Sequence, residues 1–137
     1  MLTKLIKLAK LSAVLAVVGV TTVIPVPTAL AAEAAQAFSC PSGDICFYTG
    51  DNGTGSVCMW DVDDPDWRNG ASQCSWAADS NVRSVFNNSS DPNFTGVVYY
   101  RGANYQDRAG CTRQGQRGNL AGTYKLRSHH WTNGSCG

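Results

Sequence analysis

Short runs of β-branched and aromatic residues alternate with turn dipeptides along the chain after residue 40. The dipeptides Asn52-Gly53, Asn69-Gly70 and Asn133-Gly134 favour tight turns, because both residue types tolerate a positive φ. No segment after residue 31 keeps apolar residues at helical spacing over several turns, so we expect little helix. The runs predict strands at residues 45–49, 56–60, 82–87, 96–101 and 123–128. The pattern therefore predicts an all-β fold.

The second half of this pattern repeats the first. Residues 45–52 (ICFYTGDN) resemble residues 97–104 (VVYYRGAN), with tyrosine, glycine and asparagine at the same places. Each copy also closes alike, since Val82-Arg83-Ser84 resembles Leu126-Arg127-Ser128. Internal similarity of this kind predicts a doubled β motif.

The repeat predicts one domain rather than two. Its units, at about residues 44–90 and 96–131, are each too small to bury a hydrophobic core alone, so we expect them to pack together. We therefore place a single domain at residues 39–137, preceded by a flexible leader at residues 32–38.

Residues 1–31 have the pattern of a secretory signal peptide. Three lysines precede an apolar stretch at residues 11–26, and Ala29-Leu30-Ala31 provides the small residues of a cleavage site. A retained membrane anchor is the alternative, but Pro25 and Pro27 interrupt the stretch, which is shorter than the ~20 residues of a spanning helix. We expect a secreted, extracellular monomer that leaves the membrane after cleavage of the signal.

The charge of the exported chain does not favour a nucleic-acid partner. The full chain has a formal net charge of +1, and loss of the three signal lysines lowers this to about −2. Aspartates gather at residues 61–66, whereas arginines are frequent in the second unit. Solvated loops are the simplest interpretation of both groups.

The cysteines indicate a disulfide framework. All six follow the signal, an even number in a short exported domain, which favours disulfides over metal ligands or nucleophiles: Cys40, Cys46, Cys58, Cys74, Cys111 and Cys136. Many pairings are possible, and we prefer Cys40–Cys46, Cys58–Cys74 and Cys111–Cys136. The first is the best supported, because Pro41 and Gly43 favour a turn between its two ends.

The sequence gives no support for an enzyme. His129-His130 is the one pair of histidines, the cysteines are expected to be bridged, and no motif sets a nucleophile beside a base. A zinc site would need further ligands near the histidines, and Cys136 is the only nearby candidate. We expect no catalytic residue, no cofactor and no metal site.

Taken together, the repeat resembles the βγ-crystallin family, in which each unit opens with an aromatic strand and an Asn/Gly hairpin and closes with a strand that carries a serine. From Cys40-Pro41-Ser42-Gly43 to the stretch at residues 124–128 (YKLRS), the chain is most similar to secreted metalloproteinase inhibitors of the Streptomyces type. The resemblance implies a βγ-crystallin-like double Greek-key sandwich with disulfides. It also implies a secreted proteinaceous peptidase inhibitor whose partner is a secreted protease.

The resemblance implies structural roles for Tyr48 and Tyr100, which open the two hairpins, and for Ser84 and Ser128, which support them. Each copy departs from the family's hairpin signature. In the second copy Asp107 stands where the hairpin wants glycine, and it can adopt the positive φ required there only at some cost.

The inhibitors present an exposed loop as a slowly cleaved substrate, and this implies an inhibitory loop at Cys111, Thr112 and Arg113. A rigid loop lowers the ordering cost of binding. The family closes this loop with a second cysteine where this chain has Gln116, so Cys111 needs another partner, for which Cys136 is a candidate. Thr112 is small and polar, which favours a protease that accepts Thr or Arg over one of the thermolysin type. An ordinary hairpin is the competing interpretation.

Many βγ-crystallin domains bind calcium, through stretches that correspond here to residues 79–84 and 123–128. Both place an arginine where an oxygen ligand should stand, and calcium needs about six to eight oxygens. A guanidinium repels a divalent cation, so we do not expect strong binding. The aspartates at residues 61–66 are a separate candidate for weak binding.

Two further hypotheses remain beside inhibition. The first is a non-inhibitory module that binds a cell-surface polymer or a protein through exposed Trp67, Trp76 and the acidic residues 61–66. The second is a calcium-stabilised structural protein. Core packing is the commoner role of tryptophan, and it competes with the first hypothesis.

Overall fold

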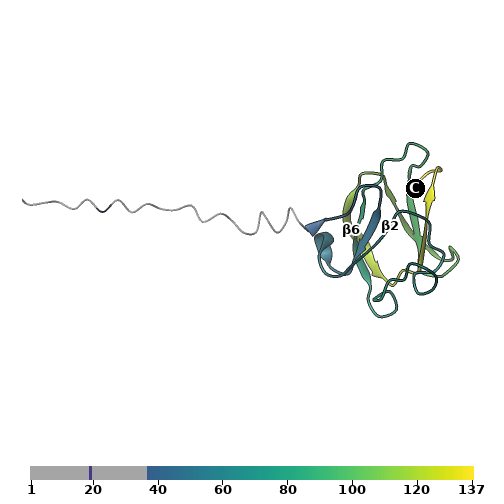
Figure 1. Ribbon diagram of the computed structural model, residues 1–137, viewed down its shortest axis with the longest axis horizontal. Coiled ribbons are helices and arrows are strands. Elements are labelled where there is room, and N and C mark those ends of the chain that lie inside the picture. Colours follow the sequence, from purple (N-terminus) through teal and green to yellow (C-terminus); the bar gives the residue numbers. More distant parts are fainter. Residues whose placement is uncertain (1–18, 20–36) are drawn as a thin grey trace, which may run out of the picture.

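The computed structural model describes Gly19 and residues 37–137. The predicted signal peptide and most of the predicted leader lie outside the described residues. The described part of the chain forms two layers of strands (Figure 1). No helix within these residues has the length and apolar character needed to cross a bilayer.

Seven strands and one short 3-10 helix make up this part of the chain. The strands are β1 (Ile45–Tyr48), β2 (Val57–Trp60), β3 (Val82–Asn87), β4 (Gly96–Tyr100), β5 (Arg108–Arg113), β6 (Arg117–Tyr124) and β7 (Ser128–Thr132). The 3-10 helix η1 (Asp51–Gly53) lies in the turn between β1 and β2. The prediction of an all-β fold is confirmed.

All strand pairs are antiparallel and form two sheets. Sheet A has the order β2-β1-β3-β6, and sheet B has the order β5-β4-β7. β6 belongs to the second unit by sequence but pairs with β3 of the first, so the chain crosses between the sheets. The corresponding place beside β7 holds a single bridge, between Asp64 and His129. Assignment of this arrangement to the βγ-crystallin double Greek key stays a prediction.

Strand prediction succeeded in the first unit and failed in part of the second. The strands predicted up to residue 101 agree with β1 to β4 within one residue, whereas β5 and β7 were missed. The strand predicted at residues 123–128 is wrong, since β6 ends at Tyr124 and β7 begins at Ser128. Glycines at positions 110, 118 and 122 lower the β propensity of β5 and β6, and only pairing with β4 and β3 makes these segments strands.

The space between the sheets is filled by aromatic side chains. Phe47 of β1 contacts Tyr99 of β4 with ring centroids 5.4 Å apart, and Trp67 stacks on Trp60 at 4.6 Å. Trp67 is completely buried. This corrects the hypothesis that Trp67 is an exposed binding residue, because its indole fills the centre of the core.

The two hairpins after β1 and β4 use the same hydrogen bonds. The Ser84 hydroxyl donates to the Gly50 carbonyl oxygen at 2.6 Å and accepts from the Gly53 amide at 2.8 Å. Ser128 donates to the Gly102 carbonyl oxygen at 2.6 Å and accepts from the Tyr105 amide at 3.1 Å. In each hairpin one serine therefore ties the folded turn to a strand of its own unit.

Positive φ angles recur at matching positions of the hairpins. Asn52 and Asn104 both have a φ of 55°, and Gly55 at 79° corresponds to Asp107 at 59°. Asp107 thus adopts the left-handed conformation expected from the sequence. Its carboxylate is paired with the exposed Arg101 guanidinium at 3.2 Å.

The three disulfides are those preferred from the sequence. They join Cys40 to Cys46, Cys58 to Cys74 and Cys111 to Cys136. The described residues contain no free cysteine. In a domain with a small core, each native disulfide contributes roughly 2–4 kcal/mol.

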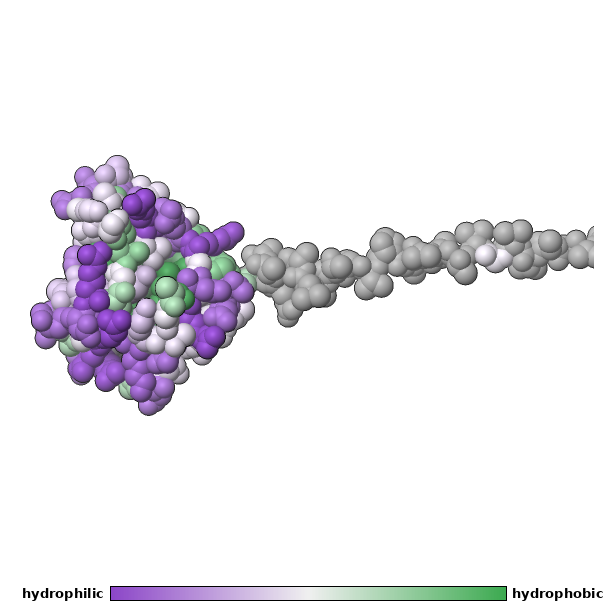
Figure 2. Space-filling model, turned by 180° about the vertical axis from the view of Figure 1, so that it is seen from behind, coloured by the Kyte–Doolittle hydropathy of each residue, from purple (hydrophilic) through white to green (hydrophobic). Residues whose placement is uncertain are grey.

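Few large apolar side chains reach the surface. Figure 2 shows a mostly hydrophilic face that small apolar areas interrupt. Of the described large hydrophobic residues, those that are exposed are Val57, Met59, Val62 and Phe94. Two of them, Val62 and Phe94, line the same cavity.

We expect stability to fall in acid because of His129, which is completely buried. The Trp67 indole N–H donates to His129 Nδ1 at 2.8 Å, so the imidazole proton sits on Nε2, 3.0 Å from the Val62 carbonyl oxygen. Burial lowers the pKa of His129 from 6.5 to about 3. Below pH 6.5 the unfolded chain binds a proton that the folded chain does not. The free energy of unfolding should therefore fall, by up to about 5 kcal/mol, between pH 6.5 and 3.

Urea unfolding at several pH values measures this dependence, and the NMR titration of the His129 ring assigns it. Hydrogen bonds from Arg127 lower the pKa of Asp66, which adds a loss in the same direction only below pH 3.8. A free energy of unfolding that stays constant from pH 6.5 to 4 would contradict the prediction.

Candidate functional site

The predicted inhibitory residues lie at the end of β5, not in a loop. Thr112 pairs with Val97 and Arg113 pairs with Gly96 in the ladder between β5 and β4. Thr112 is 8% exposed. The sequence led us to expect an exposed loop that begins at Cys111. In the structure, pairing with β4 extends the strand through Arg113, and the turn follows at residues 114–116.

β5 is an edge strand of sheet B, so one side of its backbone has no strand partner. Successive side chains of a strand point to opposite faces. Thr112 points between the sheets, whereas the Arg113 side chain is exposed to solvent. The segment thus offers a free strand edge and one basic side chain.

Asn87, the last residue of β3, holds this segment from inside. It is completely buried, and its side-chain amide donates to the Thr112 carbonyl oxygen at 3.0 Å. Its backbone amide donates to the Gln116 carbonyl oxygen at 3.0 Å, and its carbonyl oxygen accepts from the Gly115 amide at 2.8 Å. One residue therefore fixes both the end of β5 and the following turn.

This role of Asn87 was not predicted from the sequence. The residue closes an apolar run and precedes a second asparagine, a pattern that resembles an ordinary loop. One feature of the sequence could have indicated this role. Asn87 has an amide side chain at an inward position of the strand predicted at residues 82–87, and buried amides need hydrogen-bond partners. The partner itself lies far away in sequence and could not be named.

Two further contacts hold Cys111 and Thr112. The Thr112 hydroxyl lies 3.2 Å from the hydroxyl of Tyr99, and burial raises the pKa of that tyrosine, which keeps it protonated. Cys111 is linked to Cys136 near the C-terminus. A Cβ at Gly96 would lie 2.7 Å from Cys136 Sγ, so only glycine lets β4 approach this disulfide.

Each of the two stretches that correspond to calcium sites contributes an arginine to an ion pair with a carboxylate elsewhere in the chain. The Arg83 guanidinium contacts Asp51 at 3.0 and 3.1 Å, and the Arg127 guanidinium contacts Asp66 at 2.8 and 2.9 Å. In each case the arginine is the charged partner of the carboxylate. Within residues 37–137, no group of three or more histidine, cysteine, aspartate or glutamate side chains could hold a metal ion.

The acidic residues 61–66 are not a freely solvated loop. Asp64 is buried and forms the bridge to His129, and Asp66 pairs with Arg127. Asp63 accepts a hydrogen bond of 2.7 Å from the Trp131 amide. The segment therefore covers the open edge of β7, as irregular segments often do at sheet edges.

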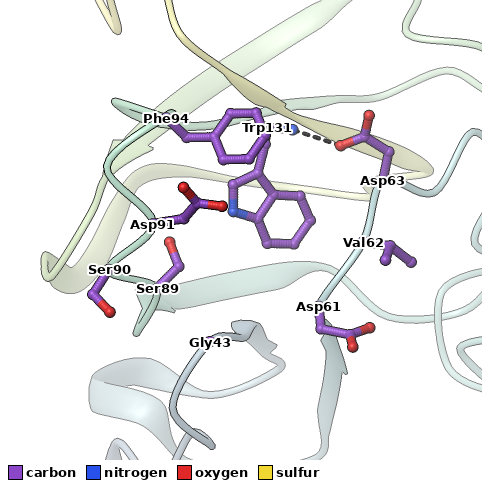
Figure 3. Close-up of a pocket in the computed structure, with 9 residues that line it drawn as sticks. All are labelled: Gly43, Asp61, Val62, Asp63, Ser89, Ser90, Asp91, Phe94 and Trp131. Atoms are coloured by element: carbon purple, nitrogen blue, oxygen red, sulfur yellow. Dashed lines mark hydrogen bonds between the residues drawn. The ribbon is translucent and has the colours of Figure 1, made fainter.

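A cavity of about 730 Å³ opens beside this segment (Figure 3). Its walls come from the ends of both sheets, and its lining residues are Gly43, Asp61, Val62, Asp63, Ser89, Ser90, Asp91, Phe94 and Trp131. It adjoins the turn after β5, because the Gln114 side-chain amide donates to the Asp91 carbonyl oxygen at 2.6 Å.

Residues 33–112 match the model of peptidase inhibitor family I36. The chain belongs to this family. The match covers the first unit and ends at Thr112, inside β5. No curated protein matches the chain. Family membership makes the protein a peptidase inhibitor rather than an enzyme and gives it a peptidase as partner.

Replacement of Asn87 by alanine should destabilise the fold. The substitution leaves the buried Thr112 carbonyl oxygen without its donor and opens a small cavity, which together cost roughly 2–3 kcal/mol. Urea unfolding of the oxidised protein measures the loss. Asn133→Ala, at an exposed asparagine, is the matched control and should change the free energy of unfolding by less than about 0.5 kcal/mol. Equal effects of the two substitutions would contradict the anchoring role of Asn87.

Proposed function

We propose that this member of peptidase inhibitor family I36 blocks a secreted peptidase with the end of β5 and the turn that follows, residues 111–116. The peptidase would dock along the free edge of β5, since an extended peptide can add to an exposed strand edge through main-chain hydrogen bonds. The wider proposal is that the protein is exported as a monomer, which suits its three disulfides, because disulfides persist in oxidising compartments.

The observation that carries this proposal is the separate anchoring of the two residues that flank one peptide bond. Cys111 is held by the disulfide to Cys136, and Thr112 is held by Asn87 and Tyr99. The disulfide and the hydrogen bonds thus hold residues on opposite sides of the bond between Cys111 and Thr112, and neither contact depends on that bond being intact. Cleavage of that bond would therefore leave both new ends in place.

Retained ends make cleavage unproductive for the peptidase. During hydrolysis, water or the nucleophile of the peptidase attacks the Cys111 carbonyl carbon, and the bond to the Thr112 nitrogen breaks. In an ordinary substrate the new amine then diffuses away. Here the amine stays near the Cys111 carboxyl group at a high effective concentration, which favours re-formation of the bond. The ordered segment also loses little conformational entropy on docking, so the complex dissociates slowly.

Side-chain exposure suggests the kind of peptidase. Thr112 points between the sheets and cannot fill a specificity pocket, whereas Arg113 is exposed. An enzyme that requires a bulky apolar side chain after the cleaved bond finds none here. We propose a target that has an acidic subsite for the second residue after the cleaved bond, where it accepts the Arg113 guanidinium.

Inhibition assays test the function and the specificity together. Trypsin-like, subtilisin-like and thermolysin-like peptidases are titrated with the oxidised protein, residues 32–137. We expect stoichiometric inhibition of an enzyme that accepts arginine at the position of Arg113. Arg113→Ala should weaken that inhibition by at least about tenfold, because a desolvated charge contact is lost. Lys125→Ala removes another exposed cation outside the segment and should leave inhibition unchanged.

Mass spectrometry of the complex locates any cleaved bond. A single cut between Cys111 and Thr112 agrees with the proposal, and a cut between Arg113 and Gln114 would move the reactive bond to the turn. No inhibition of any enzyme in the panel would leave the non-inhibitory module as the better hypothesis.

Loss of one disulfide should turn the inhibitor into a substrate. In the double variant Cys111→Ser, Cys136→Ser the carboxyl end created by cleavage is no longer tethered, so we expect faster hydrolysis by the inhibited enzyme and temporary inhibition. Time courses of residual activity and of clipped protein measure both effects. Cys40→Ser, Cys46→Ser removes a disulfide elsewhere and should keep lasting inhibition at temperatures where both variants are folded. Identical time courses for the two variants would contradict the proposed tether.

A further inference from the structure

The cavity beside Trp131 has apolar walls that are open to solvent. Trp131 comes from β7, Phe94 precedes β4, and Val62 follows β2. Val62 is 60% exposed and Phe94 is 36% exposed. Figure 3 shows the Trp131 indole at the centre, with Phe94 and Val62 around it. A cavity of about 730 Å³ is large enough for a side chain or a small ligand.

The same cavity is acidic on its rim. Asp61, Asp63 and Asp91 line it, and none of its lining residues is lysine or arginine. Asp63 accepts from the Trp131 amide and Asp91 accepts from Asn93. Asp61 makes no hydrogen bond or ion pair with any other residue of the described chain, so its carboxylate is available to a ligand.

The negative charge of Asp61 affects the pKa of the neighbouring Asp44. The pKa of Asp44 is raised by its partial burial and by the charge of Asp61. Among the described residues, no lysine or arginine forms an ion pair with Asp61, in contrast to Asp51 and Asp66, which are paired with arginines. A cationic ligand would relieve this repulsion.

The apolar walls and the acidic rim of the cavity together favour a ligand that has both an apolar part and a positive charge. Carboxylates repel an anion, and the described residues contain no group of three or more histidine, cysteine, aspartate or glutamate side chains that could hold a metal ion. An arginine or lysine side chain fits both features, since its aliphatic stem covers apolar surface and its charged end meets carboxylates. Tryptophan also attracts such a cation through its ring face.

We propose that the cavity beside Trp131 binds an arginine or lysine side chain of a protein or peptide partner. The site is separate from residues 111–116 but adjoins them through the contact between Gln114 and Asp91. A peptidase seated on the turn could therefore place a basic surface residue in the cavity. The proposal does not depend on inhibition, because the cavity can be tested with peptides alone.

Binding of short peptides to the oxidised residues 32–137 tests the proposal directly. The probe is acetyl-Ala-Arg-Arg-Ala-amide, and the Glu-Glu peptide of the same length is its control. NMR should show the indole N–H signal of Trp131, assigned with Trp131→Phe, shifting with the Arg-Arg peptide and not with the Glu-Glu peptide. Binding should weaken in 1 M salt, because salt screens charge contacts.

Variants of Asp61 provide the decisive comparison. Asp61→Asn should raise the Kd for the basic peptide by about three- to tenfold, and Asp61→Lys should abolish binding. Asp79→Asn, at an exposed aspartate outside the cavity, should leave the Kd unchanged. Unaltered binding by Asp61→Lys, or an absent Trp131 shift, would overturn the proposal. Binding of a neutral N-acetylglucosamine oligomer without the basic peptide would overturn it in favour of a sugar site.

Discussion

The hydrogen bond between Trp67 and His129 is the contact on which the arrangement of this domain depends. It joins the segment that leaves β2 to β7 of the other sheet, in the centre of an aromatic core. Since residues 37–137 form only a small core, a buried polar contact between the sheets fixes their relative position as well as stabilising them. The bridge between Asp64 and His129 and the ion pair between Asp66 and Arg127 continue this attachment.

This attachment shapes the surface at the open edge of sheet B. Because residues 61–66 cross to β7 instead of forming a full strand beside it, a cavity remains next to Trp131. At the opposite edge of the sheet, β5 has no strand partner and is held by Asn87 and a disulfide. The two regions proposed to meet partners therefore lie where sheet pairing is incomplete, which is where a β-sandwich can accept new contacts.

Local features of the sequence were sufficient for much of the fold. The runs that became β1 to β4 are rich in β-branched and aromatic residues, and the positive φ at Asp107 was expected from its place in the hairpin. Of the three disulfides, only Cys40–Cys46, at a separation of 6 residues, was supported by a local turn; the other two pairings were preferences that the structure agrees with. β5 and β7 were missed because polar and glycine residues in them carry little local preference.

The sequence by itself determined the all-β class and the presence of disulfides, because propensity, turn chemistry and the number of cysteines are local properties. Membership in the inhibitor family also follows from the sequence, through the match over residues 33–112. Only the tertiary structure decided that Thr112 is buried in a strand, that Trp67 lies in the core and that Asn87 anchors the segment around Arg113. Each of these depends on which strands pair across the two sheets. Such pairing is set by the burial of residues distant in sequence, and no local pattern encodes it.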